Sequence, residues 1–229
     1  VLPEGLEVIP ANAFNSAVNL EMVTLPDSLK TIENSAFYNT GLTSIDIPDS
    51  VETIGDHAFQ GTIHMTSADL PDSLKTMGTG AFCDAYELKS IVIPEGVTEI
   101  PAEAFAGCSA LETVVISESV ESVGASAFSG ISGDASGTTF IMKGTTPPTF
   151  DNSAFGSSKP TSLTVIVPAG SEAAYAGDGV IGNYITTGGS GDETKPGITF
   201  ALPLTDASIT AGSTTTYTAT VPELSLIHI

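Results

Sequence analysis

Phenylalanine preceded by alanine recurs along the chain at a nearly constant interval. The interval is 22 or 23 residues five times in succession and then lengthens to 27. Chance does not place seven of the ten phenylalanines on one position of a period, so the chain is a tandem repeat. The seven positions are Phe14, Phe37, Phe59, Phe82, Phe105, Phe128 and Phe155.

Each repeat also contains a short stretch in which apolar residues alternate with polar ones. In the repeat that opens with a leucine at position 42, the fourth and sixth residues are Ile45 and Ile47. Alternation of this kind is typical of a strand with one buried face, and Pro48 ends it because proline cannot donate to a ladder. A second apolar pair, Val51 with Ile54, leads into the Ala-Phe segment. Strand pairs equivalent to the first recur as Val23 with Leu25, Ile91 with Ile93, and Val114 with Ile116.

One such coil cannot bury its apolar side alone, so neighbouring coils must stack at roughly 4.8 Å and share a core. The sequence therefore predicts a repeat solenoid, a right-handed coil of about 23 residues per turn built mainly of short β-strands. The phenylalanines are expected to form a spine inside it. Each Ala-Phe segment is expected to be a short helical or 3-10 turn, capped by a side chain such as Asn34, Asp56 or Thr79.

The repeat resembles the BspA-type (Bacteroides surface protein A-like) leucine-rich repeat, Leu-x-x-Ile-x-Ile-Pro-x-x-Val-x-x-Ile-Gly-x-x-Ala-Phe. Residues 42–59 match this pattern nearly residue for residue, and the resemblance covers about residues 1–185. It implies a leucine-rich repeat solenoid whose C-terminal end, from about residue 162, is a cap with a last strand and a short helix. Ser171 is the expected N-cap of that helix, with Glu172 in its first turn.

The residues after the repeats have a different composition. Residues 186–197 are rich in glycine, serine and threonine and are expected to be a linker. Residues 198–223 alternate apolar residues with Thr or Ser and look like the start of a truncated bacterial immunoglobulin-like β domain. The last six residues, 224–229, match one reading frame of a common sequencing adapter, which indicates an assembly artefact. The chain is therefore expected to be a fragment.

The charge balance excludes some partners. The chain carries 27 acidic residues against 6 lysines and no arginine, for a net charge of −21. Such a surface repels nucleic acid and anionic lipid, and no apolar run is long enough to insert this fragment into a membrane. We expect an extracellular or cell-surface location, with the signal peptide and any anchor absent from this fragment.

No catalytic, cofactor-binding or metal-binding constellation emerges from the residue pattern. His57 occupies a surface position before an Ala-Phe pair, His64 lies in a variable loop, and His228 belongs to the C-terminal segment that indicates an artefact. No Gly-x-Ser-x-Gly elbow and no phosphate-binding glycine loop is present. Cys83 and Cys108 are expected to be buried single thiols.

Acidic residues recur in the turn after each first strand and are expected to be solvated, although whether they bind calcium stays open. These are Asp27, Asp49, Asp72 and Glu95.

A candidate binding surface follows from the strand face. The fifth residue of each repeat lies between two buried ones and should point outward, and the second residue should flank it. The fifth residues are Thr24, Asp46, Asp69, Val92, Val115, Ile141 and Ile166, and the second residues include Lys89 and Glu112. A row of exposed aliphatic residues is either a partner-binding stripe or simply good strand packing, and both interpretations stay open.

The sequence favours a non-catalytic recognition or adhesion module that binds an extracellular protein or glycan through this face. A passive spacer is the alternative from another class. A third is an accessory region of a larger surface enzyme whose catalytic domain lies elsewhere. Fold resemblance carries much of this expectation, and folds do not fix function.

Overall fold

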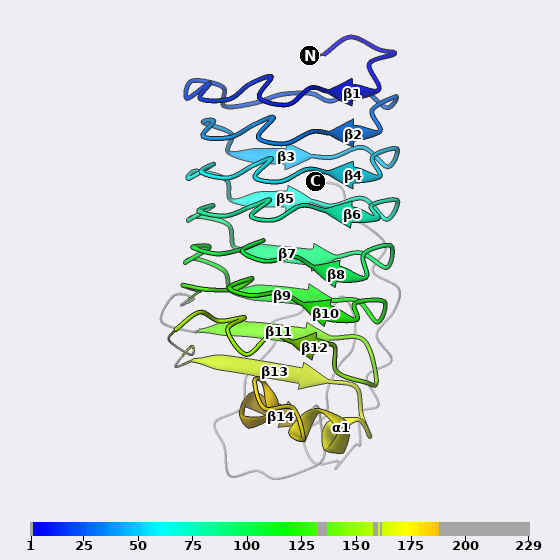
Figure 1. Cartoon of the computed structure of the whole chain (residues 1–229), viewed down its shortest axis with the longest axis vertical. Coiled ribbons are helices and arrows are strands. Elements are labelled where there is room, and N and C mark those ends of the chain that lie inside the picture. Colours follow the sequence, from blue (N-terminus) through cyan, green and yellow to red (C-terminus); the bar gives the residue numbers. More distant parts are fainter. Residues whose placement is uncertain (1, 132–136, 158–159, 161, 188–229) are drawn as a thin grey trace, which may run out of the picture. The chain divides into compact units, whose positions relative to one another are not determined.

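Successive repeats fold into coils that stack directly on one another (Figure 1). The computed structural model describes residues 2–131, 137–157, 160 and 162–187. The chain divides into two units, residues 1–190 and 191–229, and every described residue belongs to the first. That unit is a parallel β-solenoid of about seven coils with about 23 residues per turn, which confirms the predicted repeat fold. Apart from its first two residues, the expected linker lies outside the described residues, as do the expected immunoglobulin-like segment and the C-terminal artefact.

The longer strands line one face of the solenoid. Their side chains alternate between core and solvent, as the sequence pattern predicts. The ladders are parallel because each strand pairs with its equivalent one coil away. In chain order these strands are β3 (Ser44–Asp46), β5 (Ser67–Asp69), β7 (Ser90–Ile93), β9 (Thr113–Ile116), β11 (Thr138–Met142), β13 (Leu163–Val167) and β14 (Ile185–Thr187).

The second member of the second apolar pair in each repeat, such as Ile54, lies on a shorter strand on the other side of the coil. These strands pair in the orders β1-β2-β4-β6 and β8-β10-β12. They are β1 (Val8–Ile9), β2 (Thr31–Ile32), β4 (Thr53–Ile54), β6 (Thr76–Met77), β8 (Glu99–Ile100), β10 (Ser122–Val123) and β12 (Thr149–Phe150). The two sets of strands enclose the aliphatic core between them.

One predicted strand does not form. Residues 21–25 have no ladder, although the sequence pattern predicts a strand around Val23 and Leu25. This segment belongs to the first coils, where Val23 is only half-buried. Its link to the next coil is the bond from the Thr43 N–H to the Glu21 carbonyl, at 3.2 Å.

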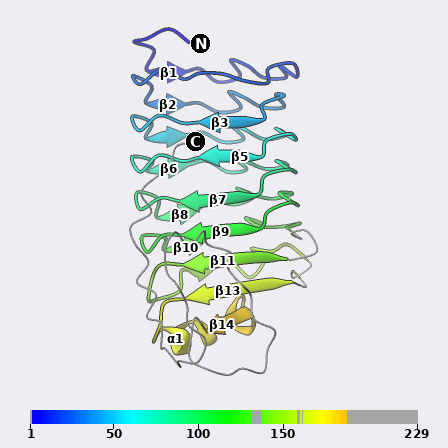
Figure 2. The same ribbon diagram turned by 180° about the vertical axis from the view of Figure 1, so that it is seen from behind.

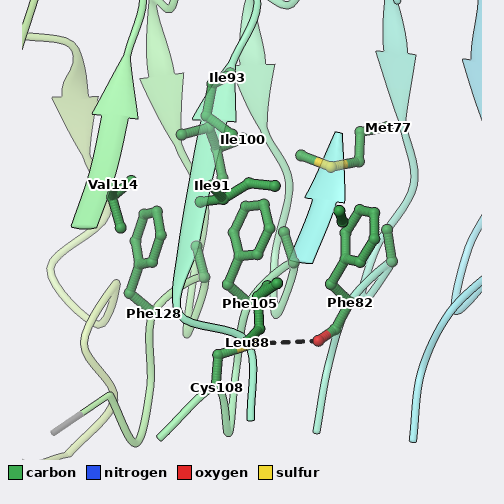
Figure 3. Packing of buried hydrophobic residues seen from close by; sticks show 14 of the residues in the cluster. Met77, Phe82, Leu88, Ile91, Ile93, Ile100, Phe105, Cys108, Val114 and Phe128 are labelled. Carbon is green, nitrogen blue, oxygen red and sulfur yellow. Dashed lines mark hydrogen bonds between the residues drawn. The ribbon is translucent and has the colours of Figure 1, made fainter. Parts of the chain in front are cut away.

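The phenylalanine spine is confirmed. From Phe14 to Phe128 neighbouring rings lie 5.1–5.7 Å apart with planes within 12° of parallel, and Figure 3 shows three of them in a row. Beyond Phe128 the regular stack ends. Phe140 meets that ring edge-on at 4.8 Å, and Phe155 lies 6.3 Å away with a 33° tilt. The break coincides with the 27-residue interval, where Phe140 also packs against Phe155 at 5.9 Å.

The Ala-Phe segments are hydrogen-bonded turns without the helical backbone of the single helical or 3-10 turn that the sequence predicts. In one of them the Tyr38 N–H donates to the Ser35 carbonyl at 3.1 Å, but Ser35 has a φ of 57°, which a helix cannot contain. The expected caps act elsewhere: Oδ1 of Asn34 accepts from the Asp56 N–H, and Oδ1 of Asp56 accepts from the Thr79 N–H. These side chains join neighbouring coils. Positive φ at this position recurs at Asn12, Ser35, His57, Gly80, Glu103 and Ser126.

The C-terminal end of the stack carries the predicted helix. Helix α1 (Glu172–Ala176) is followed by the 3-10 turn η1 (Gly182–Tyr184) and by β14, in which Thr186 and Thr187 continue the sheet. Ser171 occupies the N-cap position, with Glu172 in the first turn. Its hydroxyl, however, donates to the Pro168 carbonyl at 2.6 Å instead of accepting from the helix, because Ser171 itself has helical backbone angles.

Candidate binding surface

The longer strands lie side by side on one face of the solenoid (Figures 1 and 2). Ladder register lines up their outward-facing side chains between paired strands. Ladder register places Val92 beside Val115, Val115 beside Ile141, and Ile141 beside Ile166. The ladder register across the irregular 27-residue repeat therefore agrees with the repeat positions assigned to Ile141 and Ile166 from the sequence. We call this row the outer column; its members are Asp46, Asp69, Val92, Val115, Ile141 and Ile166, while Thr24 is exposed in a segment without a ladder.

The four aliphatic residues of the outer column are not equally exposed. Val92 is 51% exposed, whereas Val115, Ile141 and Ile166 are half-buried. Each of these three lies on a strand with ladder partners on both sides, so branched neighbours cover part of it. The expected row of four exposed aliphatics is therefore one exposed residue followed by three partly covered ones.

A second row, which the sequence analysis did not single out, runs beside the outer column. From the repeat that opens at Leu42 onward, the third residue carries a hydroxyl group and also faces outward, whereas Met22 holds this position in the preceding repeat. We call the row of hydroxyl residues the hydroxyl column. Its signal in the sequence is the recurrence of Ser or Thr at one position of the period. One ladder aligns Ser44 with Ser67, and a second ladder aligns the remaining members, which are Ser90, Thr113, Thr139 and Thr164.

The expected polar flank lies on the far side of the hydroxyl column. Lys89 is exposed and Glu112 is half-exposed, one coil apart, and the Glu112 N–H donates to the Lys89 carbonyl at 2.8 Å. Because each precedes the strand by one residue, the hydroxyl column separates both from Val92 and Val115. These two residues thus border the face rather than the outer column itself.

Carboxylates line the opposite border, in the turns that follow the longer strands. All five are exposed, and none forms an ion pair with another described residue. The serine after four of them donates to a carbonyl of the preceding coil, as from Ser50 to Leu29 at 2.6 Å and from Ser73 to Val51 at 2.7 Å. The turns are thereby fixed in place. We call this row the acidic rim; it consists of Asp27, Asp49, Asp72, Glu95 and Glu118.

The histidines do not form a reactive site within the described residues. His57 is half-buried, and its Nδ1 has no hydrogen-bond partner in the described part of the chain. His64 lies on the surface with its Nδ1 3.3 Å from Oε1 of Glu87. His228 falls outside the described residues.

Both cysteines are free and buried, as the sequence predicts. Burial, and then the neighbouring Asp84 carboxylate, raise the pKa of the Cys83 thiol to about 11. Burial also raises the pKa of Cys108, whose thiol donates to the Phe82 carbonyl at 3.3 Å (Figure 3). Thiols in this state are poor nucleophiles and packing residues rather than reactive groups.

Over residues 2–131, 137–157, 160 and 162–187, no three His, Cys, Asp or Glu side chains are grouped so as to hold a metal ion. No helix in the same ranges is long and apolar enough to cross a membrane.

Stacked coils with a leucine-led strand and a phenylalanine spine define a leucine-rich repeat solenoid. The family model of the BspA type leucine rich repeat region matches residues 7–133 in six copies, and the chain belongs to this family. No curated protein matches the chain significantly.

Solved structures of bacterial leucine-rich repeat proteins are similar to it. A leucine-rich repeat protein from Bacteroides ovatus is 25% identical, with a TM-score of 0.56, over 72% of this chain and 48% of that one. A leucine-rich repeat protein from T. pallidum is 31% identical, with a TM-score of 0.51, over 56% of this chain and 60% of that one. A leucine-rich cell surface protein from Faecalibacterium prausnitzii gives a lower TM-score of 0.40 at 25% identity, over 76% and 60%. The chain thus spans less than two thirds of the length of each.

Proposed function

We propose that this chain is a non-catalytic recognition module that binds an extracellular protein or glycan at a cell surface. The observation that carries the proposal is the register of the longer-strand face. The outer column and the hydroxyl column repeat side by side through successive coils, so that one ligand can contact several coils at once. Membership of a family of repeat proteins and the strongly acidic composition support the extracellular location.

A passive spacer is the second candidate function. It is favoured by the N-terminal part of the outward-facing row, where Thr24, Asp46 and Asp69 are exposed polar residues. An accessory role in a larger surface enzyme is the third. It is compatible with the partial coverage of the solved relatives, because the chain matches 48% of one of them.

A binding screen distinguishes a recognition module from a passive spacer. The purified chain is tested against extracellular-matrix proteins, mucins, glycans and bacterial cells, beside Val115→Asp and Val115→Thr. The control is Thr98→Asp, which introduces the same charge at an exposed position off this face. We expect binding that Val115→Asp abolishes, Val115→Thr weakens and Thr98→Asp leaves unchanged. Absence of any binding by the folded protein would favour the spacer.

A further inference from the structure

Aliphatic side chains and unpaired carboxylates occupy two parallel rows on the same face. The outer column supplies the apolar row, from Val92 to Ile166. The acidic rim runs beside the first two members of that row, Val92 and Val115, and continues beside Asp69 and Asp46. The rim follows the outer column by three residues of chain, which places it at most about 10 Å away at about 3.3 Å per residue. That separation is close to the diameter of one α-helix with its side chains.

The composition decides the charge of the occupant. No described ion pair neutralises the rim. Lys89 lies beyond the hydroxyl column on the other side, Lys143 is exposed one coil past the last rim residue, Glu118, and the chain as a whole carries a net charge of −21. An acidic or sulfated ligand would be repelled, while a basic one gains favourable contacts along the whole rim.

The spacing along the solenoid decides the shape of the occupant. Equivalent side chains of neighbouring coils are about 4.8 Å apart. The apolar stripe of an amphipathic helix repeats on average every 3.5 residues, or about 5.3 Å. An extended strand presents side chains on one face every two residues, about 6.7 Å apart, and falls out of step within two coils.

We propose that the longer-strand face binds a cationic amphipathic α-helix of a partner protein, lying along the solenoid axis. This inference rests on the proposed recognition function and names its ligand class. The apolar stripe of the helix packs on Val92, Val115, Ile141 and Ile166, and its lysines or arginines lie over the acidic rim. One end of the partner's helix, with basic residues in its last turns, continues over Asp46 and Asp69, where the outer column itself is acidic. The hydroxyl column borders the helix on its other side.

Two synthetic peptides of identical leucine and lysine composition test this proposal on the full chain. The outer column from Asp46 to Ile166 spans about 24 Å, so each probe has about 18 residues. In the first peptide the leucines form one helical stripe; in the second they are scattered around the helix. Fluorescence anisotropy measures Kd, and circular dichroism measures the helix formed on binding. We expect the striped peptide to become helical and to bind at least about tenfold more tightly than the scattered one.

Matched variants locate the contact. Val92→Asp should weaken binding of the striped peptide more than about tenfold, and Thr98→Asp should leave it within about twofold. Neutralising the rim with Asp49→Asn, Asp72→Asn and Glu95→Gln together should weaken binding at low salt, and the difference should shrink at high salt. The control neutralises three exposed acids off the face, Glu7, Glu103 and Glu121, and should have a smaller effect.

Several outcomes overturn the helix as occupant. Three results would show that the peptide binds only through nonspecific electrostatic attraction. These are equal affinity for both peptides, equal loss of affinity in both triple variants, and unchanged affinity in Val92→Asp. Failure of both peptides, while the screen finds another ligand that Val115→Asp releases, would reject the helix and leave the recognition face standing. If no ligand of any kind responds to changes on this face, the proposed function itself fails.

Discussion

Gly80 and His57 show how one residue constrains its equivalent in the next coil. Both occupy the position of positive φ before an Ala-Phe pair, at 61° and 55°. A Cβ atom on Gly80 would lie 2.5 Å from Nδ1 of His57, so the imidazole ring fills the space that a side chain would need. Serine is accepted at this position in other coils, as at Ser35 and Ser126. The backbone conformation alone therefore does not require glycine here, whereas the neighbouring ring does.

This pair predicts a compensating double substitution. Gly80→Ser should lower the free energy of unfolding by about 1–3 kcal/mol, because it overpacks against the ring. In the background of His57→Ser the same change should cost much less, since the ring is gone. Chemical denaturation of the four proteins measures the coupling. Additive effects of the two substitutions would show that the ring is not the obstacle.

The phenylalanine stack predicts a difference between the middle and the end of the spine. Phe82 is fully buried between two parallel rings, so Phe82→Ala should cost about 3–5 kcal/mol in the free energy of unfolding. Phe14 is half-buried and stacks on one ring only, and Phe14→Ala should cost clearly less. Denaturation curves of the two variants compare them directly. Equal losses of stability in the two variants would contradict the expected difference between the middle and the end of the spine.

Helix α1 is held to the stack by a side chain from its own last turn. Tyr175 is fully buried, and its hydroxyl lies 2.8 Å from the Gly144 carbonyl and 3.1 Å from that of Thr146. Those carbonyls belong to the turn after β11, so one phenol connects the helix with a coil about 30 residues earlier. The ring buries apolar surface, and the hydroxyl satisfies acceptors that the turn leaves unpaired.

Removing this hydroxyl should loosen the C-terminal element selectively. Tyr175→Phe keeps the ring and is expected to cost about 1–2 kcal/mol, through the lost hydrogen bond and the desolvated carbonyls. Hydrogen exchange should rise in α1 and β13 and stay unchanged in β4 and β6. Uniform acceleration along the solenoid would instead indicate that the whole stack unfolds as one unit.

The sequence predicted these elements unevenly, for physical reasons. Strand positions such as Ile45 and Ile47 follow from alternation, and the Phe spine follows from its period. The turns around Ser35 could not be foreseen, because positive φ depends on tertiary fit and several residue types accept it. The outward direction of Val92 was predictable from its neighbours, but the partial covering of Ile141 depends on the strands to either side.

Protonation of buried groups links the stability of the whole solenoid to alkaline pH. Burial raises the pKa of Cys83 from 9.0 to about 11 and that of Tyr175 to about 12, and it raises the pKa of Cys108 as well. Above pH 9 the unfolded chain loses protons that the folded chain keeps. The stabilisation is therefore complete below pH 9 and is lost as the pH rises through 11.

The measurement is the midpoint of thermal unfolding between pH 7 and 11. It should fall steadily above pH 9, and the fall should be shallower in Cys83→Ala, which removes one of the titrating groups. Below pH 8 the slopes of the two proteins should agree. Parallel curves over the whole range would assign the alkaline loss to groups other than this thiol.

Stacking coil on coil also sets how the protein responds to force. The backbone hydrogen bonds between coils run along the solenoid axis. Tension between the two ends of the solenoid therefore breaks these hydrogen bonds in succession and does not shear many of them at once. Each coil of about 23 residues that opens replaces about 4.8 Å of stack with up to about 75 Å of extended chain. Under tension such a molecule is expected to extend in steps, as coils unfold one after another, and to dissipate a sudden load while the remaining coils stay folded.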